Sequence, residues 1–499
     1  MEIYKADIIT MEQENKTAKY LITENEKILY VGKNLPEKYK NLPVNNLEDK
    51  TIVPGFFDTH THFSSFGFFL DTLPVFINAR SIEEISDNLS NYIKNNKKKF
   101  YIMFGISPFS VKEKRLPLKK ELDKITDKPL FIVQYDGHGA IANSALLKKM
   151  KIPPLDGFDE EKGHFFRDSF YQIVKKVTFK APLTEAIKGI KKGMDYAASQ
   201  GITSIVALQG EGFFLDIDLK LVKYYSKRSK IQIIPYFQTR NIKKFKRSKL
   251  KTWGGCFECA IDGSFGSLDA ALNEPYCIDT NIEGNKGKLF YPKEDIEKML
   301  SFAQKKDIQI AIHAIGDRAV KEVISSFKNF TKGTNQNNHR IEHALILSKE
   351  DIDIIAKEKI HIATQPAFLN DPLEPIEFLK EILGEKRFKR FMPLKEMFDA
   401  GIEVSGGSDA PVTMPSPVKG IHAAVNHPNK EQRLTPYQAL EMFTVNGAKG
   451  VRVFNNQGSI KKNKLADFVV LSNNPLKVNA KEIKNIKVLQ VFKNGKKVF

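Results

Sequence analysis

The chain has 499 residues, of which 41% are hydrophobic and 27% charged, so it is too long for one small core and suits one large barrel or two to three domains. Its net charge of +19 includes basic runs at 94–99 and 243–251, but no nucleic-acid-binding motif accompanies them, so we favour a solvated surface, expect no nucleic-acid partner and allow some steering of acidic substrates. No run of 18 apolar residues and no signal-peptide core occurs, so we expect no membrane partner and a cytoplasmic location.

Short strands separated by turns are predicted at both ends of the chain. The first fifty residues and the last forty are β-rich, and Asn494-Gly495 is typical of a two-residue hairpin turn. Because the two ends of a domain usually lie close together, the simplest assembly joins them. We therefore predict a small β-sandwich formed by residues 1–52 and 453–499, with the main domain at 53–452 inserted between its halves.

The middle of the chain alternates strands with helices. One helix is predicted after residue 434, with Thr435 as its cap and Pro436 at its first position. Repeated strand–helix units predict a parallel sheet with its helices outside, and at least seven strands over this length favour a (β/α)8 barrel over an open sheet. The later strands are predicted at 201–208, 231–239, 308–317, 339–346, 361–368 and 402–412.

One long segment does not fit the alternation. Residues 66–190 are too many for a single crossover between the first barrel strand and the strand at 201–208, so we interpret them as an insertion beside the barrel mouth. A phenylalanine-rich stretch, FSSFGFFLDTLPVF at 63–76, leads into this insertion. Its rings could form an apolar face for the substrate or pack the insertion, and the sequence leaves both interpretations open.

The cysteines do not indicate a disulfide framework. There are three, Cys256, Cys259 and Cys277, which is too few for such a framework. The first two have C-x-x-C spacing, but a zinc ribbon would need a second such pair. We therefore interpret the three as buried thiols.

Two histidines stand one residue apart after an apolar run, in GFFDTHTHFSS at 55–65. Residues i and i+2 share one face of a strand, so His60 and His62 point the same way. Three later predicted strands break their apolar pattern at the carboxyl end with His313, His343 and Asp409. Each residue alone could be an ordinary core histidine or turn residue. In a barrel, however, these ends converge on the active site, so the combination predicts a site for Zn²⁺ or a similar ion.

Seven stretches then carry a resemblance to a known family. The sequence resembles the metal-dependent amidohydrolase superfamily, and within it the branch called amidohydrolase family 3, with the YtcJ-like and N-substituted formamide deformylase-like proteins. The terminal segments also resemble the split β-sandwich of that family. The matching stretches, in order from about residue 50 to residue 450, are VPGFFDTHTHF, DGHGAIANSALL, AIDGSFGSLDAAL, IHAIGDRAV, HRIEHA, GSDAPV and LTPYQALEMFTVNGA.

The resemblance implies a divalent metal cofactor, with zinc favoured and two ions expected. His60 and His62 match the ligands of the more buried ion, while His313 and His343 match those of the second. Asp409 matches an aspartate that touches a metal and handles the proton during catalysis.

Three further residues are assigned to the substrate. His138 matches a position that reaches the substrate, where it could stabilise negative charge on the carbonyl oxygen, so we also count it as catalytic. Asp262, in the Asp-Gly motif, is assigned to substrate binding. Arg318 and Arg340 stand beside predicted ligands and could bind a substrate carboxylate, or could instead form ion pairs in the scaffold.

The sequence departs from the family at one position. Many relatives have a lysine four residues before the Asp-Gly motif, which can be carboxylated and bridge two metals, but this chain has Glu258 there. A glutamate could bridge without modification, so Glu258 is predicted to be a metal ligand. If the strand alternates regularly, Cys256 shares this face and is a weaker alternative. The other alternative is that Glu258 does not reach the metal and the site holds one ion.

These observations predict a metal-dependent hydrolase that cleaves a C–N bond in an amide or formamide-like small molecule, through attack by a metal-activated hydroxide. The alternatives are a mononuclear deaminase, or a lactonase or phosphoesterase on the same scaffold. A third is a non-catalytic barrel that binds a small molecule or a nucleic acid. Barrels of this kind often pair, so the resemblance allows a homodimer.

Overall fold

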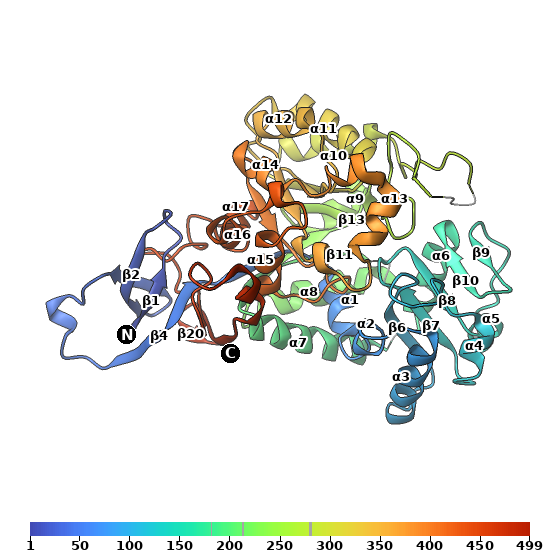
Figure 1. Ribbon diagram of the computed structural model, residues 1–499, viewed down its shortest axis with the longest axis horizontal. Helices are drawn as coiled ribbons and strands as arrows, with labels where there is room; N and C mark the ends of the chain where they lie inside the picture. The colour runs from blue at the N-terminus through green and yellow to red at the C-terminus, as the bar shows by residue number, and fades with distance from the viewer. Residues whose placement is uncertain (181, 212–213, 279–281) are drawn as a thin grey trace.

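Three sheets organise the molecule. The computed structural model describes residues 1–180, 182–211, 214–278 and 282–499. A barrel occupies the centre, a sheet built from both termini lies at one end, and the inserted segment lies at the other (Figure 1). None of the helices in these described ranges is long and apolar enough to cross a membrane.

The central barrel has eight strands, and each is parallel to its neighbours. The first and last strands meet through a bridge between Thr61 and Ala410. The amide of His62 also donates a hydrogen bond to the Ala410 carbonyl at 2.8 Å, which nearly closes the barrel. This confirms the predicted α/β barrel. The strands are β5 (Phe56–Thr61), β11 (Ile202–Gln209), β12 (Gln232–Phe237), β13 (Thr252–Ala260), β14 (Gln309–Ala314), β15 (Arg340–His343), β16 (His361–Thr364) and β17 (Val404–Gly406).

Helices surround the barrel. The start of α16 is as predicted, because the Thr435 side chain accepts a hydrogen bond from the amide of Gln438 and Pro436 occupies the first turn. The surrounding helices are α1 (Phe63–Phe69), α7 (Leu183–Ser199), α8 (Ile217–Ser226), α9 (Ile242–Ser248), α10 (Lys293–Gln304), α11 (Asp317–Thr331), α12 (Lys349–Lys357), α13 (Ile376–Phe388), α14 (Leu394–Asp399), α15 (Pro417–Val425), α16 (Pro436–Met442) and α17 (Val445–Gly450).

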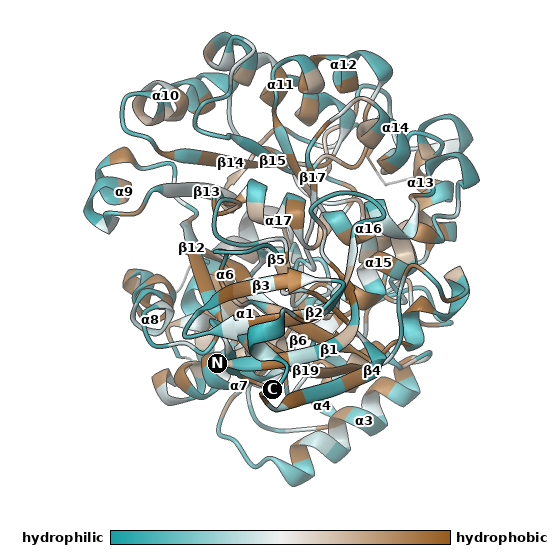
Figure 2. Ribbon diagram, turned by 90° about the vertical axis from the view of Figure 1, so that its left-hand side faces the viewer, coloured by the Kyte–Doolittle hydropathy of each residue, from teal (hydrophilic) through white to brown (hydrophobic). Residues whose placement is uncertain are grey.

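The two termini share one seven-stranded sheet. The strand β4 joins them, since it pairs with β1 on one side and β18 on the other. The ring of Tyr4 lies 5.2 Å from that of Phe468 and 5.4 Å from that of Phe492, so the sheet curls around a small core of its own. Brown and teal segments alternate along its strands (Figure 2). The strands, in spatial order, are β20 (Lys496–Lys497), β19 (Val488–Lys493), β18 (Phe468–Leu471), β4 (Val44–Pro54), β1 (Glu2–Ile9), β2 (Thr17–Glu24) and β3 (Lys27–Gly32).

The inserted segment lies between α1 and α7, and it has its own five-stranded sheet. The two flanking helices cross closely, because a Cβ atom on Gly67 would lie only 2.3 Å from the carbonyl oxygen of Gly189. Its strands, in spatial order, are β6 (Tyr101–Ile106), β7 (Leu130–Gln134), β8 (Gly139–Ala142), β10 (His164–Phe166) and β9 (Phe158–Asp159). Its helices are α2 (Pro74–Ile77), α3 (Ile82–Asn95), α4 (Lys119–Asp123), α5 (Ser144–Met150) and α6 (Arg167–Thr178).

Candidate active site

Polar side chains converge at the carboxyl ends of the barrel strands. His60 lies near the end of β5 and His62 directly follows it, His343 ends β15, and Asp409 follows β17. The strand β5 is buried along its whole length. The carboxylate of Asp58 ties it to the last strand, because it accepts hydrogen bonds from the amides of His60 (3.3 Å) and Ser408 (2.9 Å). The first and last strands therefore deliver their side chains to one place.

The first set of facing atoms belongs to His60, His62 and Asp409. The Oδ1 atom of Asp409 lies 3.1 Å from Nε2 of His60 and 3.3 Å from Nε2 of His62. This oxygen is buried, yet it accepts no hydrogen bond from any described residue. Nitrogen and oxygen ligands of one tetrahedral zinc ion stand about 3.3 Å apart, given metal–ligand distances near 2 Å. The three atoms are thus spaced as ligands of one ion would be.

The second set is centred on a cysteine thiol. Sγ of Cys256 lies 3.4 Å from Nε2 of His60, 3.6 Å from Nε2 of His343 and 3.4 Å from Nδ1 of His313. A nitrogen and a sulfur ligand on one tetrahedral zinc ion stand about 3.5 Å apart. These separations fit metal ligation as well, and the thiol lies between the first set and the two later histidines.

Glu258 does not join this cluster, which corrects the sequence-based assignment. Its side chain is exposed and accepts a hydrogen bond from the Thr239 hydroxyl at 2.9 Å. The regular alternation assumed for this strand fails, because Gly255 has a φ of 111° and Phe257 a φ of 51°. The pairing of β13 with β14 shifts over the same residues. As a result Cys256, the weaker alternative, points inward instead.

The cysteine interpretation also needs one correction. Cys256 and Cys259 are buried free thiols, as expected, but Cys277 is exposed. Its sulfur accepts a hydrogen bond from the guanidinium of Arg387 at 3.0 Å.

The Nδ1 atoms of His60 and His343 are held by buried partners. Nδ1 of His60 lies 2.5 Å from Oε2 of Glu342, and the other oxygen of Glu342 lies 2.6 Å from Nε of Arg340. Nδ1 of His343 lies 2.7 Å from Oε1 of Gln365. Such partners fix the ring orientation of a metal-binding histidine. Here they leave Nε2 of both rings facing the cluster.

Arg340 and Glu342 are fully buried, so Arg340 cannot receive a substrate carboxylate. Its guanidinium also donates a hydrogen bond to the Thr59 carbonyl at 2.8 Å. Of the two roles considered for this arginine, the ion pair in the scaffold is therefore the one the structure supports. The sequence analysis missed Glu342. The signal was present, because two charged residues spaced i, i+2 interrupt an otherwise apolar strand and must share one face.

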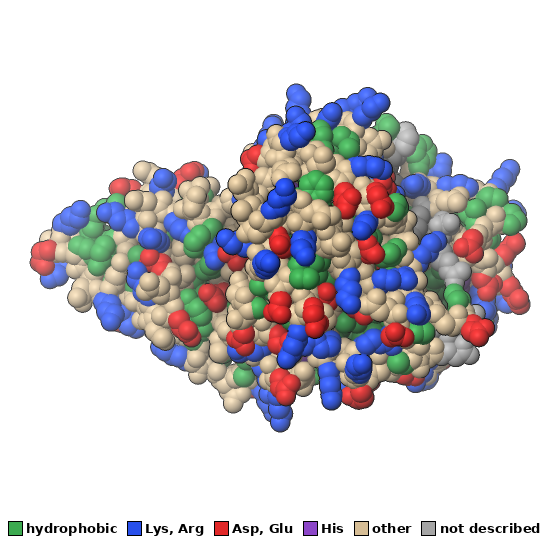
Figure 3. All heavy atoms as spheres, turned by 90° about the horizontal axis from the view of Figure 1, so that it is seen from above, with side chains coloured by type: hydrophobic (Ala, Val, Ile, Leu, Met, Phe, Trp, Pro, Cys, Tyr) green, Lys and Arg blue, Asp and Glu red, His purple; other side chains and the backbone are tan. Residues whose placement is uncertain are grey.

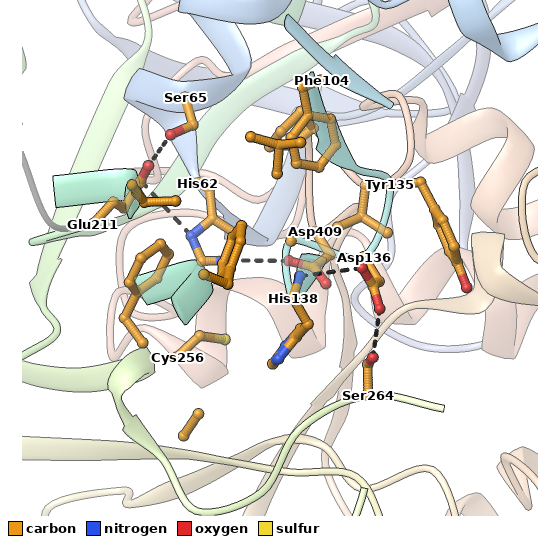
Figure 4. Close-up of a pocket in the computed structure, with 18 of the residues that line it drawn as sticks. His62, Ser65, Phe104, Tyr135, Asp136, His138, Glu211, Cys256, Ser264 and Asp409 are labelled. Atoms are coloured by element: carbon orange, nitrogen blue, oxygen red, sulfur yellow. Dashed lines mark hydrogen bonds and ion pairs between the residues drawn. The ribbon is translucent and has the colours of Figure 1, made fainter. Parts of the chain in front are cut away.

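A second carboxylate that the sequence analysis missed faces His62. Oε1 of Glu211 lies 3.7 Å from Nδ1 of His62, and its other oxygen accepts a hydrogen bond from the Ser65 hydroxyl. The backbone amide of Glu211 is in turn bound by Asp218 at 3.1 Å. Figure 4 shows Ser65, Glu211, His62 and Asp409 in one chain of contacts along the pocket.

The charges of the cluster depend on one another. Burial alone would raise the pKa of Asp409, but the neighbouring His60 and His62 hold it well below its usual range. Burial likewise opposes the Cys256 thiolate, yet His60 and His313 hold that thiol pKa well below its usual range. The arrangement therefore favours anionic oxygen and sulfur atoms balanced by cations. A bound divalent ion would supply that positive charge in place of protons on the histidines.

His138, which was assigned to the substrate from the sequence, lies at the cavity. It lines the cavity, and its amide donates a hydrogen bond to Asp136 at 3.1 Å (Figure 4). Its Nδ1 atom lies 3.9 Å from a carboxylate oxygen of Asp269. The ring therefore comes from the inserted segment and lies close to the loop that follows β13.

Asp262 and Arg318, both assigned to the substrate from the sequence, do not line the pocket. Asp262 is fully buried and accepts hydrogen bonds from the amides of Ala271, Ile315 and Gly316 at 2.8 to 3.0 Å. Burial raises its pKa to about 7. Arg318 donates a hydrogen bond to the Gly287 carbonyl at 3.3 Å. Asp262 therefore holds the backbone of two neighbouring loops, and Arg318 holds the backbone carbonyl of Gly287.

The cavity above the cluster has an empty volume of about 1250 Å³, including its open mouth. Its wall is largely apolar. Of the phenylalanine-rich stretch, Phe69 lines the cavity, whereas Phe63 and Phe66 are fully buried in packing, so both interpretations of that stretch hold in part. The lining also includes Phe104, Phe131, Phe170, Phe257, Phe265 and Phe368.

A parallel barrel that gathers histidine, cysteine and aspartate at the carboxyl ends of its strands defines a class of protein, the metal-dependent barrel hydrolases. The comparison with known families places the chain within that class. A model of the amidohydrolase family matches residues 44–499, so the chain belongs to this family. It is a hydrolytic enzyme that acts on carbon–nitrogen bonds of small molecules.

Individual relatives are similar over almost their whole length. The chain is 25% identical to the putative amidohydrolase YtcJ of Bacillus subtilis (strain 168), over 99% of this chain and 98% of that protein. It is 23% identical to the N-substituted formamide deformylase of Arthrobacter pascens, over 99% and 97%. The crystal structure of an uncharacterized metal-dependent hydrolase from Pyrococcus furiosus superposes with a TM-score of 0.76 at 23% identity, covering 95% of this chain and 100% of that one.

Proposed function

We propose that this enzyme hydrolyses the C–N bond of an amide or an N-substituted formamide with two divalent metal ions, zinc being favoured. The observation that carries the proposal is the convergence of six potential ligands at separations typical of metal coordination. The relative from Arthrobacter pascens, which is named for N-substituted formamides, supports this substrate class. The proposed ligands are His60, His62, His313, His343 and Asp409, with Cys256 between the two sets.

Metal ions bound in such a site supply polarisation of the scissile carbonyl and a lowered pKa for water. The residues of this chain provide the remaining steps. The Oδ1 atom of Asp409 faces His60 and His62, which leaves its second oxygen to take the proton of the attacking water and pass it to the leaving nitrogen. That transfer is needed because an amine anion is a very poor leaving group. His138 lies at the cavity wall, where it can donate a hydrogen bond to the carbonyl oxygen as negative charge develops.

The number of bound ions tests the metal site. We would measure metal per chain by mass spectrometry for the wild type, Cys256→Ala and Glu258→Ala. Two ions in the wild type and in Glu258→Ala, with fewer in Cys256→Ala, would support a binuclear site that includes the thiol. One ion in all three proteins would favour the mononuclear deaminase alternative. A metal-free wild type, after controls for loss during purification, would overturn the proposed chemistry.

The bond that is cleaved needs a separate assay. The metal-loaded enzyme would be given a panel of N-alkyl and N-aryl formamides and acetamides, and release of the free amine would be followed. We expect turnover of at least one formamide or acetamide. Activity confined to lactones or phosphate esters in a parallel panel, or release of ammonia from an amidine-type ring, would replace the amide assignment by one of its alternatives.

We also propose the domain division predicted from the sequence. Residues 1–52 and 453–499 would form a β-sandwich beside a catalytic barrel at 53–452, with the insertion at 66–190 shaping the pocket. The small separate core of the terminal sheet, and the cavity-lining phenylalanines of the insertion, support this division.

A further inference from the structure

The far wall of the cavity comes from the inserted segment and is apolar. Side chains from β6, β7 and α6 face the space above the metal-ligand cluster. Burying an apolar group of the substrate against them would stabilise the complex in proportion to the area removed from water. Six of these residues are Ile102, Phe104, Phe131, Val133, Phe170 and Val174.

The charged groups of the lining are all acids or histidines. No lysine or arginine occurs among the described side chains that line the cavity. The carboxylates of Asp136, Glu211, Glu374 and Asp409 all line it. A free carboxylate on the substrate would therefore have no cation on this wall to pair with, and its desolvation would go uncompensated.

Glu374 differs from the other acids in how it is satisfied. Asp136 accepts hydrogen bonds from the hydroxyls of Ser264 and Ser267 and from the amide of His138. Glu374 receives one hydrogen bond, from the Tyr135 hydroxyl to Oε1 at 2.6 Å. Its second oxygen has no donor among the described residues. One carboxyl oxygen in the cavity wall is therefore available to a hydrogen-bond donor on a ligand.

The loop that carries Glu374 is fixed to the inserted segment. The ring of Phe109 stacks on that of Phe378 with centroids 3.7 Å apart, and the Ser107 hydroxyl donates a hydrogen bond to the Leu373 carbonyl at 2.5 Å. Gly266 leaves the space for the Tyr135–Glu374 pair, because a Cβ atom there would lie 2.1 Å from the Tyr135 hydroxyl oxygen. The carboxyl is thus held in one position in the wall.

Among the described residues, no cation acts on the carboxyl of Glu374. Burial raises its pKa to about 8, and Asp371 and Asp136 add to that effect, while the Tyr135 hydrogen bond opposes it. Burial also raises the pKa of the nearby Asp371, to about 7. A carboxyl in this state keeps its proton at neutral pH because ionisation has no partner, and an ammonium group beside it would supply that partner.

We propose that the pocket selects substrates that carry an aromatic-sized apolar group and, beyond it, a protonated amine received by Glu374, and that it discriminates against substrates with a free carboxylate in that position. This selectivity rests on the proposed function, because the scissile bond must lie at the metal-ligand cluster while the amine lies at Glu374. The cationic exterior does not contradict it. Lysines and arginines are scattered among acids over the surface seen in Figure 3, whereas the charged side chains among the described residues of the cavity lining are acids and histidines.

The test uses three formamides that share one scaffold, N-benzylformamides with an aminomethyl, a hydroxymethyl or a carboxylate group at the para position. We would measure kcat/KM for each with the metal-loaded wild type, Glu374→Gln and Glu377→Gln. Glu377 lies three residues further on, is exposed and is outside the cavity lining, so it is the matched control.

In the wild type we expect kcat/KM for the cationic substrate to exceed that for the neutral one at least tenfold, with the carboxylate substrate the poorest. The preference should grow from pH 6.5 to 8.5, as Glu374 loses its proton. In Glu374→Gln the cationic-to-neutral ratio should fall to about one at every pH, and in Glu377→Gln it should match the wild type. A wild-type ratio of one or less, or a ratio unchanged in Glu374→Gln, would overturn the proposal.

If neither a formamide nor an acetamide is hydrolysed, the proposed function fails, and the amine subsite is then tested by calorimetric binding of the same three compounds. Tenfold tighter binding of the cationic compound than of the neutral one, lost in Glu374→Gln, would support the amine subsite on its own. Equal binding of the two would overturn it.

Discussion

Glu342 is the residue on which the orientation of the first histidine depends. Its two oxygens are divided between Nδ1 of His60 and Nε of Arg340, and all three side chains are fully buried. Burial by itself would raise the pKa of Glu342, but Arg340 and His60 hold it below its usual range. The carboxylate is therefore ionised, and it orients the ring so that Nε2 faces the other ligands.

Glu342→Gln keeps the shape of this side chain but removes its charge. We expect the affinity for metal to fall by about 10- to 100-fold, the usual effect of losing an outer-shell partner. Competition with a chelator of known affinity would measure it. The matched control is Glu350→Gln on the exposed first turn of α12. Equal metal affinity in Glu342→Gln and the wild type would show that His60 is oriented without its carboxylate partner.

Asp409 serves two purposes in the proposed mechanism, as a ligand and as the carrier of a proton. Asn can still present an oxygen toward His60 and His62, but an amide is too weak a base to accept the proton of the attacking water. We therefore expect Asp409→Asn to retain metal while kcat falls by about 10²- to 10⁴-fold, the usual contribution of general acid–base catalysis. Metal content and kcat would be measured on the same preparation. A variant with metal and an intact kcat would remove Asp409 from the proton transfer.

At the scale of secondary-structure elements, the crossing of α1 and α7 anchors the inserted segment on the barrel. Gly67 and Gly189 allow it, since each would place a Cβ atom within 2.7 Å of the backbone of the other. Both helices therefore approach to backbone contact, which fixes where the segment leaves and re-enters the barrel. The apolar wall of the cavity is positioned through this contact.

Gly67→Ala should strain that crossing. We expect it to destabilise the fold by about 1–3 kcal/mol, the usual cost of inserting an atom into a well-packed contact. Gly193→Ala on α7 is the matched control, because its Cβ atom would meet the Phe63 ring of α1 at an ordinary 3.4 Å. Alanine in a helix interior is favoured over glycine by roughly 0.5–1 kcal/mol, so this control should be neutral or slightly stabilising. Urea denaturation would measure the free energy of unfolding of both variants. Equal stability of Gly67→Ala and Gly193→Ala would show that the crossing can relax.

At the scale of the whole molecule, the barrel closes through few backbone contacts. The seam between β5 and β17 has the Thr61–Ala410 bridge and short hydrogen bonds such as that from the Asp409 amide to the His60 carbonyl at 2.8 Å. His60 and His62 lie on one side of this seam and Asp409 on the other. An ion held by these three residues would therefore join the first strand to the last.

Removal of metal by a chelator should consequently lower Tm and open the seam. A ligand present at a thousand times its Kd stabilises the folded state by about 4 kcal/mol, and that contribution would be lost. Hydrogen exchange should increase most in β5 and β17, and addition of Zn²⁺ should restore both readouts. An exchange increase spread evenly over all barrel strands would contradict the role of the ion at the seam.

Much of this architecture could be predicted from local patterns. Apolar runs broken by His313, His343 and Asp409 at one end indicated both the barrel and its candidate ligands, because strand–helix alternation fixes which strand ends meet. The start of α16 and the hairpin turn at Asn494-Gly495 also followed from short-range chemistry. Asn494 and Gly495 both have positive φ, as that turn requires.

The amino-acid sequence by itself determined the family, the barrel and the histidine and aspartate cluster, since these depend on residue types at intervals set by strand geometry. Only the tertiary structure decided that Cys256 turns inward and Glu258 does not, because glycine and positive-φ positions break the period of two that would have placed both residues on one face. It also decided the partners of His60 and the carboxyl at the cavity wall. Glu342 acquires its role from His60, and Glu374 acquires its role from Tyr135. Both partners lie far away in the chain, and no local pattern specifies such contacts.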